Sequence, residues 1–395
     1  MGTYGGRTAV AALGIVLAVA PGCAPGGDAD GRAARGPGAT QAARGQRGFT
    51  LLASGDVLPH DSIIRQSQRD GARSGSGYDF RPMFAGVKDV VSGADLAICH
   101  METVYGERSG PFSGWPAFVS PPQVARALKE TGYDSCSTAS NHTLDAGSTG
   151  VRRTLDAMDA VGLRHTGSAR SAAESARVNL LRAGPAKVAH LSYTYGTNGI
   201  PVPEGSPWAV NLIDDERIVA DARSARKAGA DVVAVSLHWG TEWQRDPDEQ
   251  QLTLAKRLTA ARSGGRPDID VILGTHNHVP QAYEKVGGTW VVYGMGDQLA
   301  GEMFNPQGAP DGRGNQSSLA RFTFAPPPRA GGRWTVTKAE FLPQLTDQGP
   351  PFRVVALGRA VRERPGRADL ADAREQIREA VLSRGAAKDG LVMGD

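Results

Sequence analysis

The chain has 395 residues, of which 40% are hydrophobic and 22% are charged, and its formal net charge at pH 7 is +3. This length accommodates one large domain or two average ones, with enough apolar residues for a substantial core. Because the net charge is small and the arginines are scattered, the composition argues against nucleic acid as a partner.

The first 47 residues predict an export signal followed by a tether. Arg7 precedes an apolar run over residues 9–20, too short to span a bilayer, which is typical of a signal peptide over residues 1–22. A small residue precedes Cys23, as at the cleavage site of bacterial lipoproteins, so we expect a lipid on Cys23 that holds the protein at the membrane. Simple secretion is the alternative. Residues 23–47 are rich in Gly, Ala, Arg, Asp and Pro and predict a disordered tether.

Strands and helices alternate through the expected domain, residues 48–345. Apolar runs and periodic patterns predict strands over 49–56, 95–99, 133–138, 231–237 and 270–274, and helices over 81–92, 121–131, 150–161, 214–228 and 248–262. This alternation favours an α/β sheet with crossover connections. The long loop 105–122, rich in Gly, Pro and Ser, is expected to line a site or to be mobile.

Hairpin patterns indicate a second sheet. They fall at 178–195, 281–293 and 317–342, where short apolar segments flank turns rich in Gly and Pro. We therefore expect an α/β fold with two sheets packed face to face between helices. A C-terminal extension over residues 346–395 is expected to carry a helix at 368–383 and to end loosely.

Two cysteines remain after Cys23. Cys99 and Cys136 both fall in strand-like runs that could be neighbours in a parallel sheet. In an exported protein they could form a disulfide, but the sequence favours buried free thiols.

Ligand-type side chains end the expected strands. Carboxyl ends of parallel strands meet at one edge of a sheet, so these residues are expected to converge. His276 and His278 would point to the same side if the backbone stays extended. Each residue also has a plainer interpretation, such as a turn for Asp56 or a helix cap for Asn141. The set comprises Asp56, Glu102, Asn141, His238, His276 and His278.

This mixture of oxygen and nitrogen ligands predicts a metal centre. It suits Mn, Fe or Zn better than calcium, and six ligands are too many for one catalytic zinc. We therefore expect two divalent metal ions that share a carboxylate. His142 follows Asn141 and points elsewhere, so it is interpreted as a proton donor, oriented by Asp145. His60, His165 and His190 are interpreted as structural histidines.

The motifs together resemble the CapA family of poly-γ-glutamate capsule biosynthesis, which is related to the calcineurin-like metallophosphoesterases. The resemblance covers about residues 49–300 and implies a four-layered α/β/β/α metallophosphoesterase-like sandwich with two metal ions and His142 as proton donor. Its motifs are Leu52–Val57, Asp95–Thr103, Ser140–Gly147, His238–Glu242 and Gly274–Val279.

Three positions depart from the patterns of the family and its relatives. His100 stands where the family usually has Asn, and we do not favour it as a ligand. Leu58 replaces the second ligand of the phosphoesterase Asp-x-His pattern, so one metal ion is expected to be held less tightly. Asp297 could compensate as a carboxylate, but a turn residue is the favoured interpretation.

The ligand set and the resemblance together favour a metal-dependent hydrolase, and the N-terminal sequence predicts that it lies at the outer face of the cytoplasmic membrane. Its expected substrate is a phosphoester or an amide-linked anionic polymer, and its expected partners are membrane components of a polymer synthase. A non-catalytic factor that binds or assembles the polymer is the alternative, and a phosphatase directed at the cell wall or lipid is a third possibility.

Overall fold

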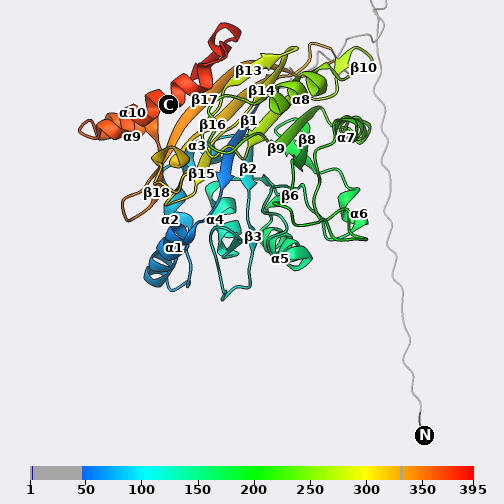
Figure 1. Cartoon of the computed structure of the whole chain (residues 1–395). Coiled ribbons are helices and arrows are strands. Elements are labelled where there is room, and N and C mark those ends of the chain that lie inside the picture. The colour runs from blue at the N-terminus through cyan, green and yellow to red at the C-terminus, as the bar shows by residue number, and fades with distance from the viewer. Residues whose placement is uncertain (1, 3–46, 330–331) are drawn as a thin grey trace, which may run out of the picture. The chain divides into compact units, whose positions relative to one another are not determined.

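Two β-sheets lie face to face in the computed structural model of the chain, which describes residues 2, 47–329 and 332–395 (Figure 1). The larger sheet has nine strands. Its main path runs in the order β18 (Arg353–Ala356), β17 (Thr335–Asp347), β16 (Gln316–Ala325), β1 (Phe49–Val57), β2 (Leu96–Met101), β5 (Ser135–Ser137) and β6 (Arg164–Thr166). Beside this path, β15 (Asp297–Leu299) pairs with β1, and β19 (Leu391–Met393) pairs with β17.

The smaller sheet has six strands and contains the hairpins predicted at 178–195 and 281–293, so the expected second sheet is present. Its order is β13 (Tyr283–Val286), β14 (Thr289–Val292), β12 (Val271–Thr275), β9 (Val232–His238), β8 (Ala186–Thr194) and β7 (Leu180–Ala183). The hairpin predicted at 317–342 belongs to the larger sheet instead, because its first strand pairs with the strand over residues 49–57. Two short ribbons are separate from both sheets: β3 (Val104–Tyr105) with β4 (Val119–Ser120), and β10 (Arg262–Ser263) with β11 (Arg266–Pro267).

Strand direction brings the ends of the central strands to one edge of each sheet. β1, β2, β5 and β6 run parallel in the larger sheet, and β8, β9, β12 and β14 run parallel in the smaller one. The remaining pairs, including β1 with β16 and β16 with β17, are mostly antiparallel. The parallel strands therefore present their carboxyl ends together, which is where α/β sheets bind ligands.

Successive residues of each strand face opposite sides of the sheet, so its apolar side chains lie in two separate cores. Leu51, Ala53 and Ile98 of the larger sheet meet Ala234 and Leu273 of the smaller sheet in one buried core. Leu52, Ala97 and Cys99 face the opposite side, as the period of two in a strand requires. The larger sheet thus buries both faces, which explains its nearly continuous apolar sequence.

Helices cover the outer faces and complete the predicted four-layered α/β/β/α arrangement (Figure 1). The outer face of the larger sheet is covered by α1 (Asp61–Ser74), α2 (Arg81–Phe84), α3 (Lys88–Ser92), α4 (Gln123–Thr131) and α5 (Gly147–Ala160). The outer face of the smaller sheet is covered by α7 (Asp215–Lys227) and α8 (Glu249–Ala260). The one-turn helix α6 (Ala172–Ser175) has no buried residue.

Side-chain caps fix the start of the two helices on the smaller sheet. The side chain of Asp214 accepts a hydrogen bond at the start of α7, and Asp248 forms a capping box with Gln251 at the start of α8. The helix predicted over 81–92 is broken into α2 and α3, because Gly86 forms a bridge with Val355 and a side chain there would collide with a neighbouring carbonyl oxygen.

The C-terminal segment packs on the main domain. Beyond β17 the chain forms β18, α9 (Leu357–Glu363) and α10 (Ala368–Leu382), and α10 matches the helix predicted at 368–383. Leu370, Ile377 and Val381 of α10 enter the core that the two sheets share. The expectation of a loose end is wrong, because the short helix η2 (Ala386–Asp389) leads into β19, which pairs with β17.

A disulfide joins Cys99 and Cys136, so the preference for free thiols is wrong. The two residues lie directly opposite each other in the parallel pair β2 and β5, with their Cα atoms 4.4 Å apart. This register between two strands was not available from the sequence. The bridge lies under the outer helices, in the same core as Leu52.

The predicted signal peptide, Cys23 with its predicted lipid and the predicted tether lie outside the described residues, apart from Gly2 and from Arg47 at the last position of the tether. In the described part of the chain, no helix combines the length and the apolar character needed to cross a membrane.

Candidate metal centre

The ends of separate strands deliver the candidate ligands to one place. Asp56 near the end of β1 lies opposite His100 on β2 and opposite Asp297 on β15. Glu102 follows β2 directly, and its backbone N–H donates to the carbonyl oxygen of Val57 on the neighbouring strand. Parallel registry of neighbouring strands therefore gathers these side chains, as the positions at strand ends predicted.

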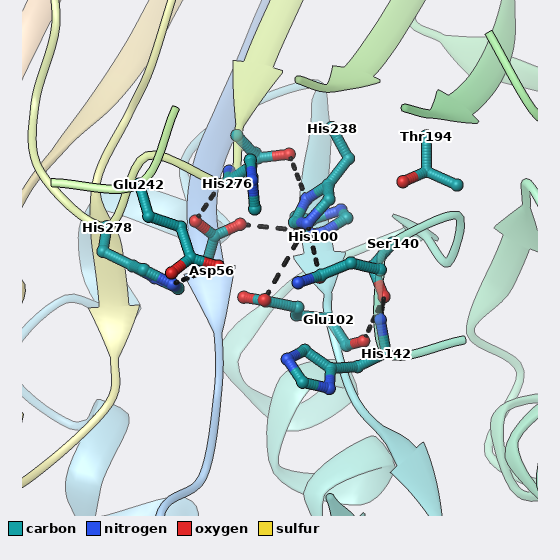
Figure 2. Close-up of polar contacts among 12 residues, drawn as sticks. Asp56, His100, Glu102, Ser140, His142, Thr194, His238, Glu242, His276 and His278 are labelled. Atoms are coloured by element: carbon teal, nitrogen blue, oxygen red, sulfur yellow. Dashed lines mark hydrogen bonds and ion pairs between the residues drawn. The ribbon is translucent and has the colours of Figure 1, made fainter. Parts of the chain in front are cut away.

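The smaller sheet contributes the imidazoles. His238 ends β9 opposite Thr275, the last residue of β12, and His276 follows that strand. The backbone N–H of His276 donates to Oδ2 of Asp56 at 3.1 Å, which links the two sheets across the site. Figure 2 shows the side chains of His238, His276 and His100 directed toward Asp56 and Glu102.

His276 and His278 converge by a route that differs from the predicted one. Their backbone is not extended, because φ is 95° at His276 and 59° at His278. Such values are rare for residues other than glycine and store strain, which concentrates at functional sites. Gly274 allows this bend to lie against β14, since a side chain there would fall 2.0 Å from the carbonyl oxygen of Tyr293.

Three overlapping groups of ligand atoms lie close enough to hold metal ions. Within each group, one ligand atom per residue lies within 4.8 Å of all the others. Asp56, Glu102 and His238 each belong to two groups, so neighbouring ions could share ligands. The groups are Asp56 with His100 and His238; Glu102 with His238 and His276; and Asp56 with Glu102, His278 and Asp297.

Six of the buried polar atoms in these residues lack hydrogen-bond partners in the described structure. Both carboxylate oxygens of Glu102, Oδ1 of Asp56 and Oδ2 of Asp297 accept no hydrogen bond. Nε2 of His100 and Nδ1 of His276 are equally unpaired. Buried polar atoms are normally satisfied, and an unpaired buried charge is costly. A cluster of lone pairs with no donor fits divalent cations.

Electrostatics support the same conclusion. Burial and the neighbouring carboxylates raise the pKa of Asp56 and the pKa of Glu102 well above their ordinary values. Burial and the neighbouring imidazoles lower the pKa of His238 and the pKa of His276, which keeps both rings neutral. Neutral imidazole is the form that ligates, and a bound cation favours ionised carboxylates.

His142 stands at the edge of the cluster, as Figure 2 shows, and carries a carboxylate partner. Its Nδ1 lies 2.6 Å from Oδ2 of Asp145, the pairing expected from the sequence. The backbone N–H of Phe118 also donates to this oxygen at 2.7 Å, and the Phe118 ring packs edge-on against His142. Oδ1 of Asn141 instead lies 2.9 Å from Nε2 of His238, inside the cluster.

Two residues that the sequence did not favour as ligands lie within the cluster. Nε2 of His100 is 3.6 Å from Oδ1 of Asp56, and its ring stacks on that of His238. The interpretation of Asp297 as a turn residue is wrong, since it begins β15, is fully buried and has Oδ1 3.0 Å from Nδ1 of His278. Leu58 offers no ligand and packs among apolar side chains.

Three further residues near the centre were missed. Oε1 of Glu242 lies 4.0 Å from Nε2 of His278, and the ring of Tyr195 lies 4.5 Å from that of His276. His60 was interpreted as structural but lines the cavity beside the centre, with Nε2 unpaired. Glu242 ends the motif His238–Glu242, so the sequence contained a signal for it. Tyr195, which follows β8, lies in no such motif.

A cavity of about 1030 Å³ opens beside the cluster. It is lined by His142, Asp145 and His278, together with loop 105–122, which was predicted to line a site. The candidate proton donor and one candidate metal ligand therefore share a wall with space for a substrate.

A second group of ligand-type residues lies on the surface. Asp159, His165 and Glu174 have ligand atoms within 4.8 Å of one another. The guanidinium of Arg170 forms ion pairs with both carboxylates, so their charges are compensated by the protein itself. This group therefore lacks the unpaired atoms that mark the central cluster.

Comparison with known proteins agrees with the motifs. The model of the family described as "Bacterial capsule synthesis protein PGA_cap" matches residues 50–302. The capsule biosynthesis protein CapA of Bacillus anthracis is 26% identical over 178 residues, which are 44% of this chain and 42% of that protein. The PGA biosynthesis protein CapA of Bacillus subtilis is 28% identical over 177 residues, 44% of each chain. The chain thus matches less than half the length of these relatives.

Among solved structures, a calcineurin-like phosphoesterase from Bacillus subtilis is similar at 15% sequence identity and a TM-score of 0.39. The similarity covers 76% of this chain and 91% of that chain.

Proposed function

The chain belongs to the bacterial capsule synthesis protein family, and from this premise we propose that it is a metal-dependent hydrolase acting on a phosphoester or an amide-linked anionic polymer. One observation carries the proposal: buried carboxylate oxygens and imidazole nitrogens from separate strands converge with no hydrogen-bond donor to satisfy them. A structural polar cluster would contain its own donors.

Two divalent ions, most suitably Mn, Fe or Zn, would be held by the six residues expected from the sequence. His100 and Asp297 join them, because their unpaired atoms face the same cluster. When bound, such ions supply Lewis acidity and neutralise negative charge on the reacting group. The six are Asp56, Glu102, Asn141, His238, His276 and His278.

His142 is proposed to donate a proton to the leaving group. The contact between Nδ1 and Asp145 leaves Nε2 available on the side of the cavity that His142 lines. The carboxylate fixes the ring orientation, as the carboxylate partner of a catalytic histidine commonly does. The backbone N–H of Phe118 holds that carboxylate in place.

We also propose the cellular setting that the N-terminal sequence predicts. A signal peptide over residues 1–22 and a lipid on Cys23 would place the domain at the outer face of the cytoplasmic membrane, with secretion as the alternative. Membrane components of a polymer synthase are the proposed partners, since the similar Bacillus proteins are named for capsule and PGA biosynthesis.

Elemental analysis combined with an activity panel tests the proposal. Purified protein is expected to contain divalent metal, and to hydrolyse at least one member of a panel of phosphoesters and γ-glutamyl amides. His276→Ala should lose metal and activity together, whereas His142→Ala should lose activity and retain metal. His165→Ala, which alters a histidine outside the centre, is the matched control and should retain both.

The alternative, a non-catalytic factor that binds polymer, gives a different pattern. Polyglutamate would bind equally well to metal-free protein and to His142→Ala, and no ester or amide would be turned over. That result would refute hydrolysis and favour assembly.

A further inference from the structure

The cavity beside the metal cluster has walls rich in aromatic side chains. Trp115 and Phe118 come from loop 105–122, Trp243 follows the motif that contains His238, and Phe304 comes from the loop after β15. Segments far apart in the chain thus place aromatic rings around one space of about 1030 Å³.

Two of these four rings are exposed although they are apolar. Trp115 is 73% exposed and Phe304 is 55% exposed, and Ile200 on the same wall is 36% exposed. Exposed apolar side chains gathered at one opening mark a ligand or partner site, whereas isolated ones need no explanation. Packing within the domain does not require Trp115 or Phe304, so their positions point to something that binds there.

The charges of the cavity do not suit a polyanion. No lysine lines it, and its one arginine, Arg65, pairs with Glu302 at 3.4 Å. Asp61 and Glu242 add negative charge and form no ion pair with an arginine or lysine in the described part of the chain. Proteins bind rows of carboxylates or phosphates through arginine and lysine, and apart from the paired Arg65 this wall offers neither.

We propose that the cavity binds the leaving group of the substrate, and that this group is an uncharged ring: a glycosyl, nucleosidyl or aryl moiety esterified to one phosphate. The inference rests on the proposed function and narrows its substrate to a phosphomonoester with a ring, rather than a polyglutamate chain. Flat rings stack on Trp115 and Phe304, while Asn198, Asn305 and Asp61 offer hydrogen bonds to ring hydroxyls.

The placement of His142 agrees with this assignment. It lines the cavity together with the aromatic residues, so a ring bound there has its ester oxygen on the side of the proton donor. Hydrolysis breaks the bond between phosphorus and that oxygen and forms a bond from phosphorus to a water oxygen. His142 gives its proton to the departing alcohol and regains one from the attacking water, so the net reaction consumes one water.

Calorimetric binding of two matched phosphonates to the full metal-loaded chain tests the proposal. Phenylphosphonate and n-hexylphosphonate carry the same anionic group and the same number of carbons, but only the former carries a ring. We expect phenylphosphonate to bind about tenfold more tightly, and Trp115→Ala and Phe304→Ala each to weaken its binding about fivefold with little effect on inorganic phosphate. Val392→Ala, at an exposed apolar residue on β19, is the control and should change neither.

The outcomes separate the two proposals. If inorganic phosphate binds but the two phosphonates bind equally, the ring site is wrong and the metal centre stands. Tighter binding of hexylphosphonate would indicate an alkyl chain, and strong binding of poly-γ-glutamate that competes with phenylphosphonate would indicate a polymer; either overturns the inference. If no metal and no phosphate bind, the proposed function fails and the inference fails with it. Among glycosyl, nucleosidyl and aryl phosphates, the ratio kcat/KM then identifies the source of the ring.

Discussion

Removal of metal should destabilise the domain by an amount that the structure allows us to estimate. Binding to the folded state alone stabilises by RT ln(1 + [L]/Kd), or about 2.7 kcal/mol at a metal concentration of one hundred times Kd. The compact unit spans Gly45–Asp395, and at about 2.1 cal/mol/K per residue its unfolding entropy is roughly 0.7 kcal/mol/K. Chelation should therefore lower Tm by about 4 °C.

Two isosteric variants distinguish this effect from a general loss of charge. Glu102→Gln removes a buried carboxylate that has no partner, so metal-free protein should unfold at the same or a higher temperature while the metal-dependent shift disappears. Asp270→Asn alters an equally buried carboxylate that pairs with Arg226 and Arg333. This control should lower Tm with or without metal and keep the shift.

Differential scanning calorimetry of the three proteins, with chelator and with Mn²⁺ or Zn²⁺, measures these shifts. A Tm of the parent protein that neither chelator nor any divalent metal moves would refute the reasoning. So would a full metal-dependent shift in Glu102→Gln, because the shift would then arise elsewhere.

Three further predictions concern the proton donor, a buried histidine and the disulfide. His142→Ala should lower kcat by about a hundred- to ten-thousandfold, with a smaller loss for esters of good leaving groups such as p-nitrophenol; equal losses for all esters would argue against proton donation. Burial lowers the pKa of His190 to about 3, so its contribution to the free energy of unfolding is fully present above pH 6.5 and should fall by about 2 kcal/mol at pH 5. Urea unfolding at several pH values measures this loss. His190→Gln should flatten the pH dependence, and an unchanged slope in that variant would count against the prediction. The disulfide restricts the unfolded chain by linking residues that are 37 positions apart. Its reduction, or the double variant Cys99→Ser and Cys136→Ser, should therefore lower the free energy of unfolding by about 4 kcal/mol. Equal stability of the oxidised and reduced protein would contradict this.

Much of the fold could be predicted from local patterns. Periodic patterns predicted the helix at 248–262, which forms as α8 with a capping box at Asp248, and the buried runs predicted β9 and β12 to within a residue or two. The prediction failed where a distant partner decides the conformation. Gly86 interrupts a helix-like pattern because its backbone pairs with Val355, and that contact has no local signature.

The site divides in the same way. Residue types at strand ends identified Asp56, Glu102, His238 and His276, since carboxyl ends of parallel strands meet whatever the intervening chain. The argument for His276 and His278 from an extended backbone was wrong in its premise, because both residues adopt positive φ. They reach the cluster through a strained bend that only the packed structure maintains.

The sequence by itself determined the kinds of candidate ligand, their order along the strands and the family to which the chain belongs. Those properties follow from side-chain chemistry and from periods within single elements. Only the tertiary structure decided that Asp297 and His100 lie among the candidate ligands, that Cys99 and Cys136 are bonded, and that aromatic side chains gather beside His142. Each of these depends on the register between strands or on the packing of loops that are far apart in sequence. Register and packing are set when the two sheets bury their faces against each other, and no local sequence pattern encodes them.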